Sequence, residues 1–358
     1  MLLLPSVKDI LKLYGFNSPE QFLYKVGSSD TSDFPTQKTL KNIFSGETSP
    51  SRKTIEKLGH AIPENSVARI SLQDMLSGKK SPKNYISEWE PILEGLKLGF
   101  PPDFFPKSFE KLEELITSER KLIQDINKTK SPQKKLYLFA KEKNMQTVLS
   151  KYEQNILKKA TALSPEVLIT LGKAKCKIMM LFAAYFDAEI GIAYQEKFGP
   201  EFSFVKLIMP RVEENKYLSP IERLFRRWKD VTGVSFKKMA EFIQADTQQD
   251  DPNDAAWTKF KQWRRGEHPV SYRDMSDLLL AIKPDIAPVT LENSIMLYYH
   301  ALALHSFFQE CLGINTDFPK ELEGKRPFQL DSELVEWMQE YYETFFDMAY
   351  KEFSVDQA

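Results

Sequence analysis

Six lysines lie close together in the middle of the chain, around the pair Ser131-Pro132, and the chemistry they could perform is the neutralisation of phosphate. They are Lys128, Lys130, Lys134, Lys135, Lys141 and Lys143. Lysine contacts to phosphate carry no base information and weaken as salt is added. A helix face of lysines that contacts only solvent has the same pattern. The sequence therefore leaves open both a non-specific phosphate-binding face and a solvated one.

Charge is unevenly distributed along the chain, although the net charge is only −1. Residues 118–162 contain eleven Lys and Arg against four Asp and Glu, whereas residues 315–358 contain four against eleven. This asymmetry indicates a partner with a charged surface, contact between the two segments, or two solvated helix faces. The small net charge argues against a protein that coats nucleic acid indiscriminately.

Catalytic and metal-binding patterns are absent from the sequence. His300 and His305 are five residues apart, which does not place them on one helix face as a metal pair requires. Cys176 and Cys311 lie in no metal-ligand spacing, and glycine-rich phosphate loops, HExxH and GxSxG are missing. We expect no metal, no cofactor and no enzymatic activity. A nuclease or other enzyme whose site is assembled only by the fold remains an alternative.

Length and composition predict a multidomain, cytoplasmic protein. The 358 residues exceed one ordinary core, and 25 Phe, 14 Tyr and 5 Trp can build a large apolar interior. Two cysteines suit the cytosol, and the start, Met1 to Pro5, is too short and uncharged for a secretory signal. The longest apolar run, 178–186, is about half of what spans a bilayer. We expect a buried helix there and no membrane association.

The elements that position these residues are predicted to be helices. Apolar residues recur near every 3.6 positions, as in Val148, Tyr152 and Ile156, and we find no alternating strand runs bounded by hairpin turns. Ser164-Pro165-Glu166 predicts the start of a long helix that continues to about Phe198. The predicted fold class is therefore all-α.

An internal repeat gives the clearest sign of organisation. Residues 39–62 align without a gap with residues 259–282, at an offset of 220. The matched apolar residues are Leu40, Ile43, Ile55, Leu58, Ala61 and Ile62 with Phe260, Trp263, Met275, Leu278, Ala281 and Ile282. Each copy is predicted to form two helices joined by a tight turn.

The turn of each copy carries its own signals. Gly46 and Gly266 are placed to end the first helix in the left-handed conformation that glycine adopts at low cost. Ser51 and Ser271 stand where the N-cap of the next helix is expected. Two more helical segments precede each copy: 7–14 and 18–26 before the first, 221–231 and 235–243 before the second.

This order of short helices resembles the Cro/repressor-type (Xre-like) helix-turn-helix domain. The matching features are the serine that starts the second helix (Ser18, Ser235), the apolar i, i+3 pair in the third, the Gly-Glu turn and a closing apolar helix. The resemblance covers about 60 residues in each copy. The chain departs from the family because residues 27–36 and 244–255 replace a very short turn between the second and third helices.

The resemblance implies which side chains contact DNA. Exposed positions of the third helix reach base edges in that family. In copy one these positions are Thr36, Gln37, Lys38, Lys41 and Asn42, and in copy two they include Trp257, Thr258, Lys261 and Gln262. The predicted interface also includes Arg264 and Arg265 as phosphate contacts, and Ser51, Arg52 and Arg273 at the following helix. The side chains of copy one are better suited to base contacts, and copy two remains available for protein contacts.

Proline and glycine positions divide the chain into five parts. They are copy one (1–77), a linker (78–107), a central helical region with a basic face (108–217), copy two (218–287) and C-terminal aromatic, acidic helices (288–358). The last part is predicted to form a helical hairpin that packs in the core or in a homodimer interface.

Two functions follow from these predictions. The first is a prokaryotic transcriptional regulator that binds duplex DNA through its helix-turn-helix modules. The alternative is a helical scaffold or adaptor subunit of a nucleoprotein or phage-defence assembly, with the modules contacting protein or RNA. Stoichiometric co-purification with another subunit would favour the alternative.

Overall fold

The computed structural model is almost entirely helical and includes one two-stranded antiparallel sheet, so the predicted all-α class is confirmed. The structure describes residues 4, 11, 16–30, 34–45, 47–59, 87–99, 105–199, 202–214, 216–243, 252–268, 270–311 and 332–355. The segment around Ser77 to Pro82, Gly46, Ala61 and Ile62 lie outside these residues, and so does the first helix expected in copy one apart from Leu11.

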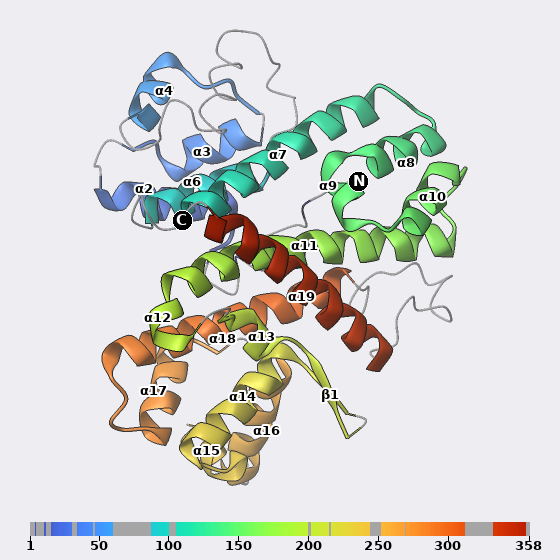
Figure 1. The fold of residues 1–358 in the computed structure, drawn as a ribbon. Coiled ribbons are helices and arrows are strands. Elements are labelled where there is room, and N and C mark those ends of the chain that lie inside the picture. Colours follow the sequence, from blue (N-terminus) through green and yellow to red (C-terminus); the bar gives the residue numbers. More distant parts are fainter. Residues whose placement is uncertain are drawn as a thin grey trace.

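The helices form three groups (Figure 1). The N-terminal group comprises α2 (Pro19–Asp30), α3 (Gln37–Phe44) and α4 (Arg52–Gly59). The central group comprises α6 (Trp89–Gly99), α7 (Pro106–Asn127), α8 (Pro132–Lys141), α9 (Lys143–Val148), α10 (Lys151–Lys159), α11 (Pro165–Ala193), α12 (Gln195–Phe198) and α19 (Ser332–Val355). The third group comprises α13 (Phe204–Ile208), β1 (Arg211–Glu213), β2 (Lys216–Leu218), α14 (Pro220–Thr232), α15 (Phe236–Glu241), α16 (Pro252–Arg265), α17 (Tyr272–Ile282) and α18 (Pro288–Cys311).

Helix α11 contacts most of the other helices of the central group, and α19 packs along it. The hydroxyl of Ser164 caps α11 by accepting from the Val167 amide at 3.3 Å, as predicted from Ser164-Pro165. Buried Asp187 joins α11 to two other elements, because it accepts from the Tyr342 hydroxyl at 2.5 Å and from the Phe204 amide at 2.7 Å. One carboxylate thus holds α19 and α13 at the same point of α11.

Helix α11 also supplies the cap of α7, which begins without a side-chain cap of its own. Glu189 accepts from the amides of Lys107 at 2.9 Å and Ser108 at 3.0 Å. A carboxylate at the positive end of a helix is favoured by the helix dipole and satisfies amides that have no partner within the helix. The cap lies 82 residues away in sequence from Lys107, so no local pattern could predict it.

Two sequence predictions about chain organisation need correction. Helix α6 occupies residues predicted as a linker, and Trp89, Ile92 and Leu93 are buried in the central core. The predicted C-terminal hairpin does not form in the described residues, because α19 packs on α11 whereas α18 packs on α14 and α17. Tyr298 and Tyr299 of α18 and Tyr342, Phe345 and Phe346 of α19 are therefore buried in different cores.

A short hairpin, β1–β2, was not predicted. Arg211 pairs with Leu218 and Glu213 with Lys216 in antiparallel register. Strands of three residues are too short to show an alternating pattern, which explains the missed element.

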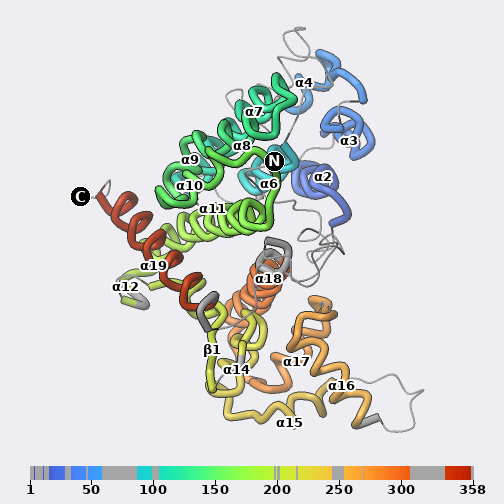
Figure 2. Tube along the Cα trace, turned by 90° about the vertical axis from the view of Figure 1, so that its right-hand side faces the viewer, coloured from blue at the N-terminus to red at the C-terminus, as the bar shows by residue number. Residues whose placement is uncertain are grey.

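Copy one and copy two lie at opposite ends of the molecule in both views (Figures 1 and 2). The α14–α17 part forms a lobe below the central helices, and α18 leads from this lobe towards α11. A surface on one copy therefore faces a different part of space from the same surface on the other copy.

Candidate nucleic-acid interface

The turn of the repeat has the same hydrogen bonds in both copies. The Glu47 amide donates to the Asn42 carbonyl at 2.9 Å, and the Glu267 amide donates to the Gln262 carbonyl at 3.1 Å. Gly266 has the left-handed backbone predicted for it, with φ of +71°. These bonds are related by the same offset of 220, so the sequence alignment corresponds to a structural repeat.

The predicted serine N-caps are also present in both copies. Ser51 accepts from the Thr54 amide and Ser271 from the Asp274 amide, each at 3.1 Å. The second helix of each copy begins in the same way: Ser18 accepts from the Gln21 amide and Ser235 from the Lys238 amide, each at 3.2 Å. A capping serine stabilises a helix start by about 1 kcal/mol, which gives a physical reason for serine at these four sites.

The apolar face of the repeat is buried in both copies. Leu40 and Ile43 of α3 pack in a small core with Leu23, and their counterparts Phe260 and Trp263 pack in the larger core of copy two. The i, i+3 spacing places each pair on one side of its helix, so the other side faces outward. This burial fixes which face of α3 is available to a partner.

Helix α3 presents polar side chains on that outward face. Gln37, Lys38 and Lys41 are exposed and Asn42 is partly exposed. In the described part of the chain, these four side chains have no hydrogen-bond or ion-pair partner. Thr36, also predicted to read a base, is the N-cap of α3, and its hydroxyl accepts from the Thr39 amide at 3.3 Å. Amide and ammonium groups that are unengaged suit contacts to base edges in a major groove.

The predicted contacts at the start of α4 are exposed but partly engaged. The Ser51 hydroxyl is used in capping, as described above. Arg52 is 88% exposed and forms an ion pair with Glu56 at 3.2 Å. An exposed pair of this kind contributes little, at most about 1 kcal/mol, so a phosphate could displace Glu56 at low cost.

Copy two differs because several of its predicted contact residues are used in packing. Arg264, predicted to contact phosphate, instead forms an ion pair with Glu222 at 2.8 Å and lies 3.8 Å from the Phe236 ring centroid. Burial, more than the surrounding charges, lowers the pKa of Arg264. Trp257 is partly buried and stacks on Phe260. These two side chains take part in the packing of copy two.

The other predicted residues of copy two lie nearer the surface. Thr258, Arg265 and Arg273 are exposed, and Gln262 is partly exposed. Lys261 is partly exposed and lies over the Trp257 ring at 5.9 Å. The outward face of α16 is therefore less free than that of α3.

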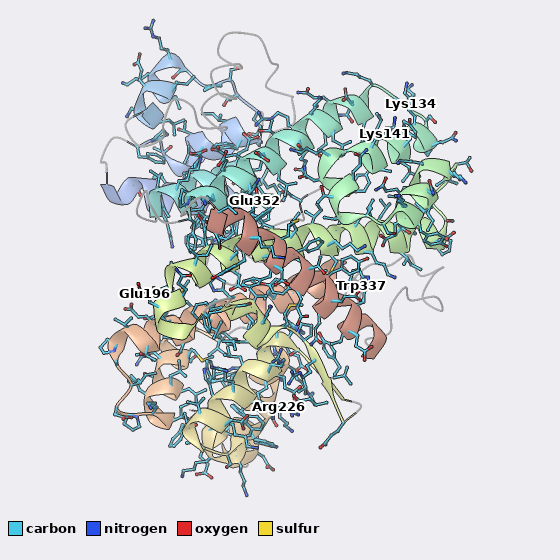
Figure 3. All side chains as sticks on the ribbon, viewed as in Figure 1. Lys134, Lys141, Glu196, Arg226, Trp337 and Glu352 are labelled. Atoms are coloured by element: carbon cyan, nitrogen blue, oxygen red, sulfur yellow. The ribbon has the colours of Figure 1, made fainter. Side chains whose placement is uncertain are left out.

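The six central lysines lie on α8 and at the helix ends beside it, and Figure 3 labels Lys134 and Lys141. All but Lys135 are exposed, and Lys135 is partly exposed. Lys128 pairs with Asp125 at 2.7 Å. The remaining five have no carboxylate within ion-pair distance in the described part of the chain. Five of the six lysines are therefore exposed, on or next to α8.

The acidic C-terminal segment does not neutralise this basic region in the described residues. Helix α19 instead forms an ion pair with α7 through Glu352 and Lys111, at 2.7 Å, and Lys111 precedes the basic segment 118–162. Among the described residues, no ion pair joins the basic segment to the acidic one.

A second basic group, on α14, was not predicted from the sequence. Arg223, Arg226 and Arg227 lie at i, i+3 and i+4, on the face opposite buried Leu224 and Phe225. The helical spacing of the arginines is the signal that could have revealed it.

The described residues contain neither a cluster of metal ligands nor a helix that could span a membrane. No three His, Cys, Asp or Glu side chains there converge as metal ligands. Among the same residues, no helix combines the length and apolar character needed to cross a bilayer.

Comparison of the chain with protein-family models, with curated proteins and with solved structures yields no significant match. The resemblance to the Xre-like domain therefore remains a prediction from the sequence.

Proposed function

We propose that the protein binds duplex DNA through the outward face of α3 and acts as a transcriptional regulator of the prokaryotic type. The observation that carries the proposal is the contrast between the two copies. Gln37, Lys38 and Lys41 project from a helix that ends in the same turn as its counterpart, and within the described residues their side chains form no hydrogen bond or ion pair. In copy two, Arg264 and Trp257 are used in packing.

The two copies have different roles in this proposal. The two copies lie at opposite ends of the molecule (Figure 1), and we assign the specific base contacts to copy one alone. Specific contacts come from α3, and the exposed central lysines add salt-dependent attraction to phosphates. Copy two then serves the architecture of the protein or a second contact.

The test is a titration of the full-length protein against random and genomic duplex DNA at two salt concentrations. We expect tight, competition-resistant binding to a few sequences. Lys38→Ala and Gln37→Ala should each weaken specific binding by about 1–3 kcal/mol, the size of a base contact. Lys283→Ala removes the same charge from an exposed site at the end of α17 and should leave binding unchanged. Unchanged affinity in both α3 variants would refute the assignment.

An adaptor role is the second candidate, and exposed apolar side chains favour it. Tyr272 on α17 and Val289 and Met296 on α18 are large, apolar and exposed. Aromatic side chains and methionine are enriched at protein interfaces. Weak DNA binding that collapses with salt, together with stoichiometric co-purification of another subunit, would select this function.

A further inference from the structure

The basic side of α14 faces a cavity that no function described above uses. The cavity has a volume of about 500 Å³ and lies between α14, the start of α15 and strand β1. Its lining includes Arg211, Arg223, Arg226, Arg227 and Lys229, against the two carboxylates Glu213 and Asp230. The lining therefore has a formal net charge of +3. Figure 3 labels Arg226, the central member of this group, beside the β1–β2 hairpin.

The amphipathic pattern of α14 creates this arrangement. Ile221, Leu224, Phe225 and Trp228 are buried on one side of the helix, so the arginines interleaved with them must lie on the other. The hairpin then brings Arg211 and Glu213 to the same side. Charges that a helix alone would expose to solvent are thus gathered around a concave site.

The carboxylates present do not satisfy the arginines. Glu213 is shared, with Arg226 at 2.9 Å and Arg211 at 3.8 Å, and Glu222, 3.9 Å from Arg226, is itself shared with Arg264 at 2.8 Å. The Nε of Arg226 is buried and has no hydrogen-bond acceptor among the described residues. Arg227 is exposed and has no ion-pair partner in the part of the chain that the structure describes. A buried donor without an acceptor is costly, and an incoming anion would remove that cost.

Arg223 shows that positive charge is crowded here. Its guanidinium donates to the carbonyl oxygens of Lys206, at 3.2 Å, and Met209. These bonds hold Arg223 in place without neutralising it. Burial, followed by repulsion from Arg211 and Arg227, lowers the pKa of Arg223 to about 10. A ligand with negative charge would relieve this repulsion.

We infer that this cavity binds the phosphate groups of a small molecule, with Arg223, Arg226 and Arg227 as the main contacts. Guanidinium groups pair with phosphate oxygens through two parallel hydrogen bonds, which explains a preference for phosphate over a simple halide. The volume exceeds that of one phosphate and falls within the range of about 300–1,000 Å³ typical of ligand pockets. The concave shape favours a compact ligand, such as a nucleoside di- or triphosphate, over a duplex backbone.

The experiment measures binding to the full-length protein by calorimetry, with inorganic tripolyphosphate and adenosine triphosphate as the probes. We expect saturable binding at one site. Arg227→Glu, at an exposed position, should weaken it by about tenfold or more, the effect of one charge-assisted hydrogen bond. Lys134→Glu makes the same charge change on α8, in the other lobe, and should alter affinity by less than about twofold, since exposed charges beyond a Debye length are screened.

Three outcomes would overturn the inference. They are the absence of saturable binding, equal weakening by the two variants, and displacement of tripolyphosphate by duplex DNA with the same sensitivity to Arg227→Glu. The last would assign the cavity to a nucleic-acid backbone. Because the site lies outside copy one, loss of DNA binding in the α3 variants would leave phosphate binding intact, so the two proposals can fail separately.

Discussion

Lys177 offers the sharpest test of how the central group is held together. Its side chain is fully buried on α11, and its ammonium group lies 2.8 Å and 3.1 Å from the two carboxylate oxygens of Glu153 on α10. The same ammonium group lies 3.9 Å from the centroid of the Tyr341 ring on α19. One cation therefore connects three helices, and we predict that Lys177→Met is strongly destabilising.

The magnitude follows from what the substitution leaves behind. Methionine fills nearly the same volume, so little packing is lost. Glu153 is only 13% exposed and would keep its charge without a counterion. Removing one member of a buried pair costs about 3–5 kcal/mol, and partial hydration of Glu153 places the expected loss near the lower end. A loss of about 3 kcal/mol is a large part of the usual 5–15 kcal/mol stability of a protein.

The effect should depend on pH. Burial alone would raise the pKa of Glu153, but hydrogen bonds from Lys177 and Ser150 outweigh it and hold the pKa below its ordinary value of 4.5. A carboxylate with a lowered folded-state pKa stabilises the protein above its unfolded pKa, and this contribution is lost as pH falls through the folded pKa. The difference between wild type and Lys177→Met should therefore shrink below about pH 4.5.

Equilibrium urea denaturation of the full-length protein measures these changes. Lys151→Met, at an exposed position of the helix that carries Glu153, is the control and should change the free energy of unfolding by less than about 0.5 kcal/mol. The double variant with Glu153→Gln should recover part of the loss, because no buried charge is left unpaired. If Lys177→Met costs no more than Lys151→Met, the pair does not stabilise the helices in the way argued here.

Two further predictions concern the turn of copy two. Burial lowers the pKa of His305 to about 4, so the unfolded state takes up a proton first as pH falls. Relative to His305→Gln, the free energy of unfolding of the wild type should therefore fall by about 1.4 kcal/mol per pH unit between about pH 6.5 and 4. Denaturation at several pH values measures this, and a difference that stays constant with pH would contradict it. Gly266→Ala should cost at least about 2 kcal/mol, because an added Cβ would lie 2.5 Å from Ile221 Cδ1 at a φ of +71°. Gly233 has the same φ but open space around it, so Gly233→Ala should cost less, and equal thermal shifts would refute the steric argument.

Part of the candidate interface was predictable because it depends on interactions between near neighbours in the sequence. The capping bonds of Ser51 and Ser271 span three residues, and the turn bonds of Glu47 and Glu267 span five. The apolar spacing of α3 then predicted which of its faces is exposed. Residue types and short separations were sufficient for these features, since the groups involved are neighbours in any chain that folds into a helix.

Other features depended on neighbours that the sequence could not identify. Arg264 has the same residue type as Arg265 beside it, yet Arg264 is held by Glu222, 42 residues earlier, and Arg265 is exposed. The predicted linker contained α6 because this helix packs on α2 and α7 and its Trp89 ring contacts Phe182 of α11, so its apolar residues are buried in the core.

By itself, the sequence determined the helical class, the repeat and the helix starts, because hydrogen bonds between near neighbours specify them. Only the tertiary structure decided which charges remain free. It tied Arg264 into packing, left the α3 face and the central lysines exposed, and gathered the α14 arginines with the β1 hairpin around one cavity. The reason is that the state of a charge depends on its surroundings in space, and those are formed by segments far apart along the chain.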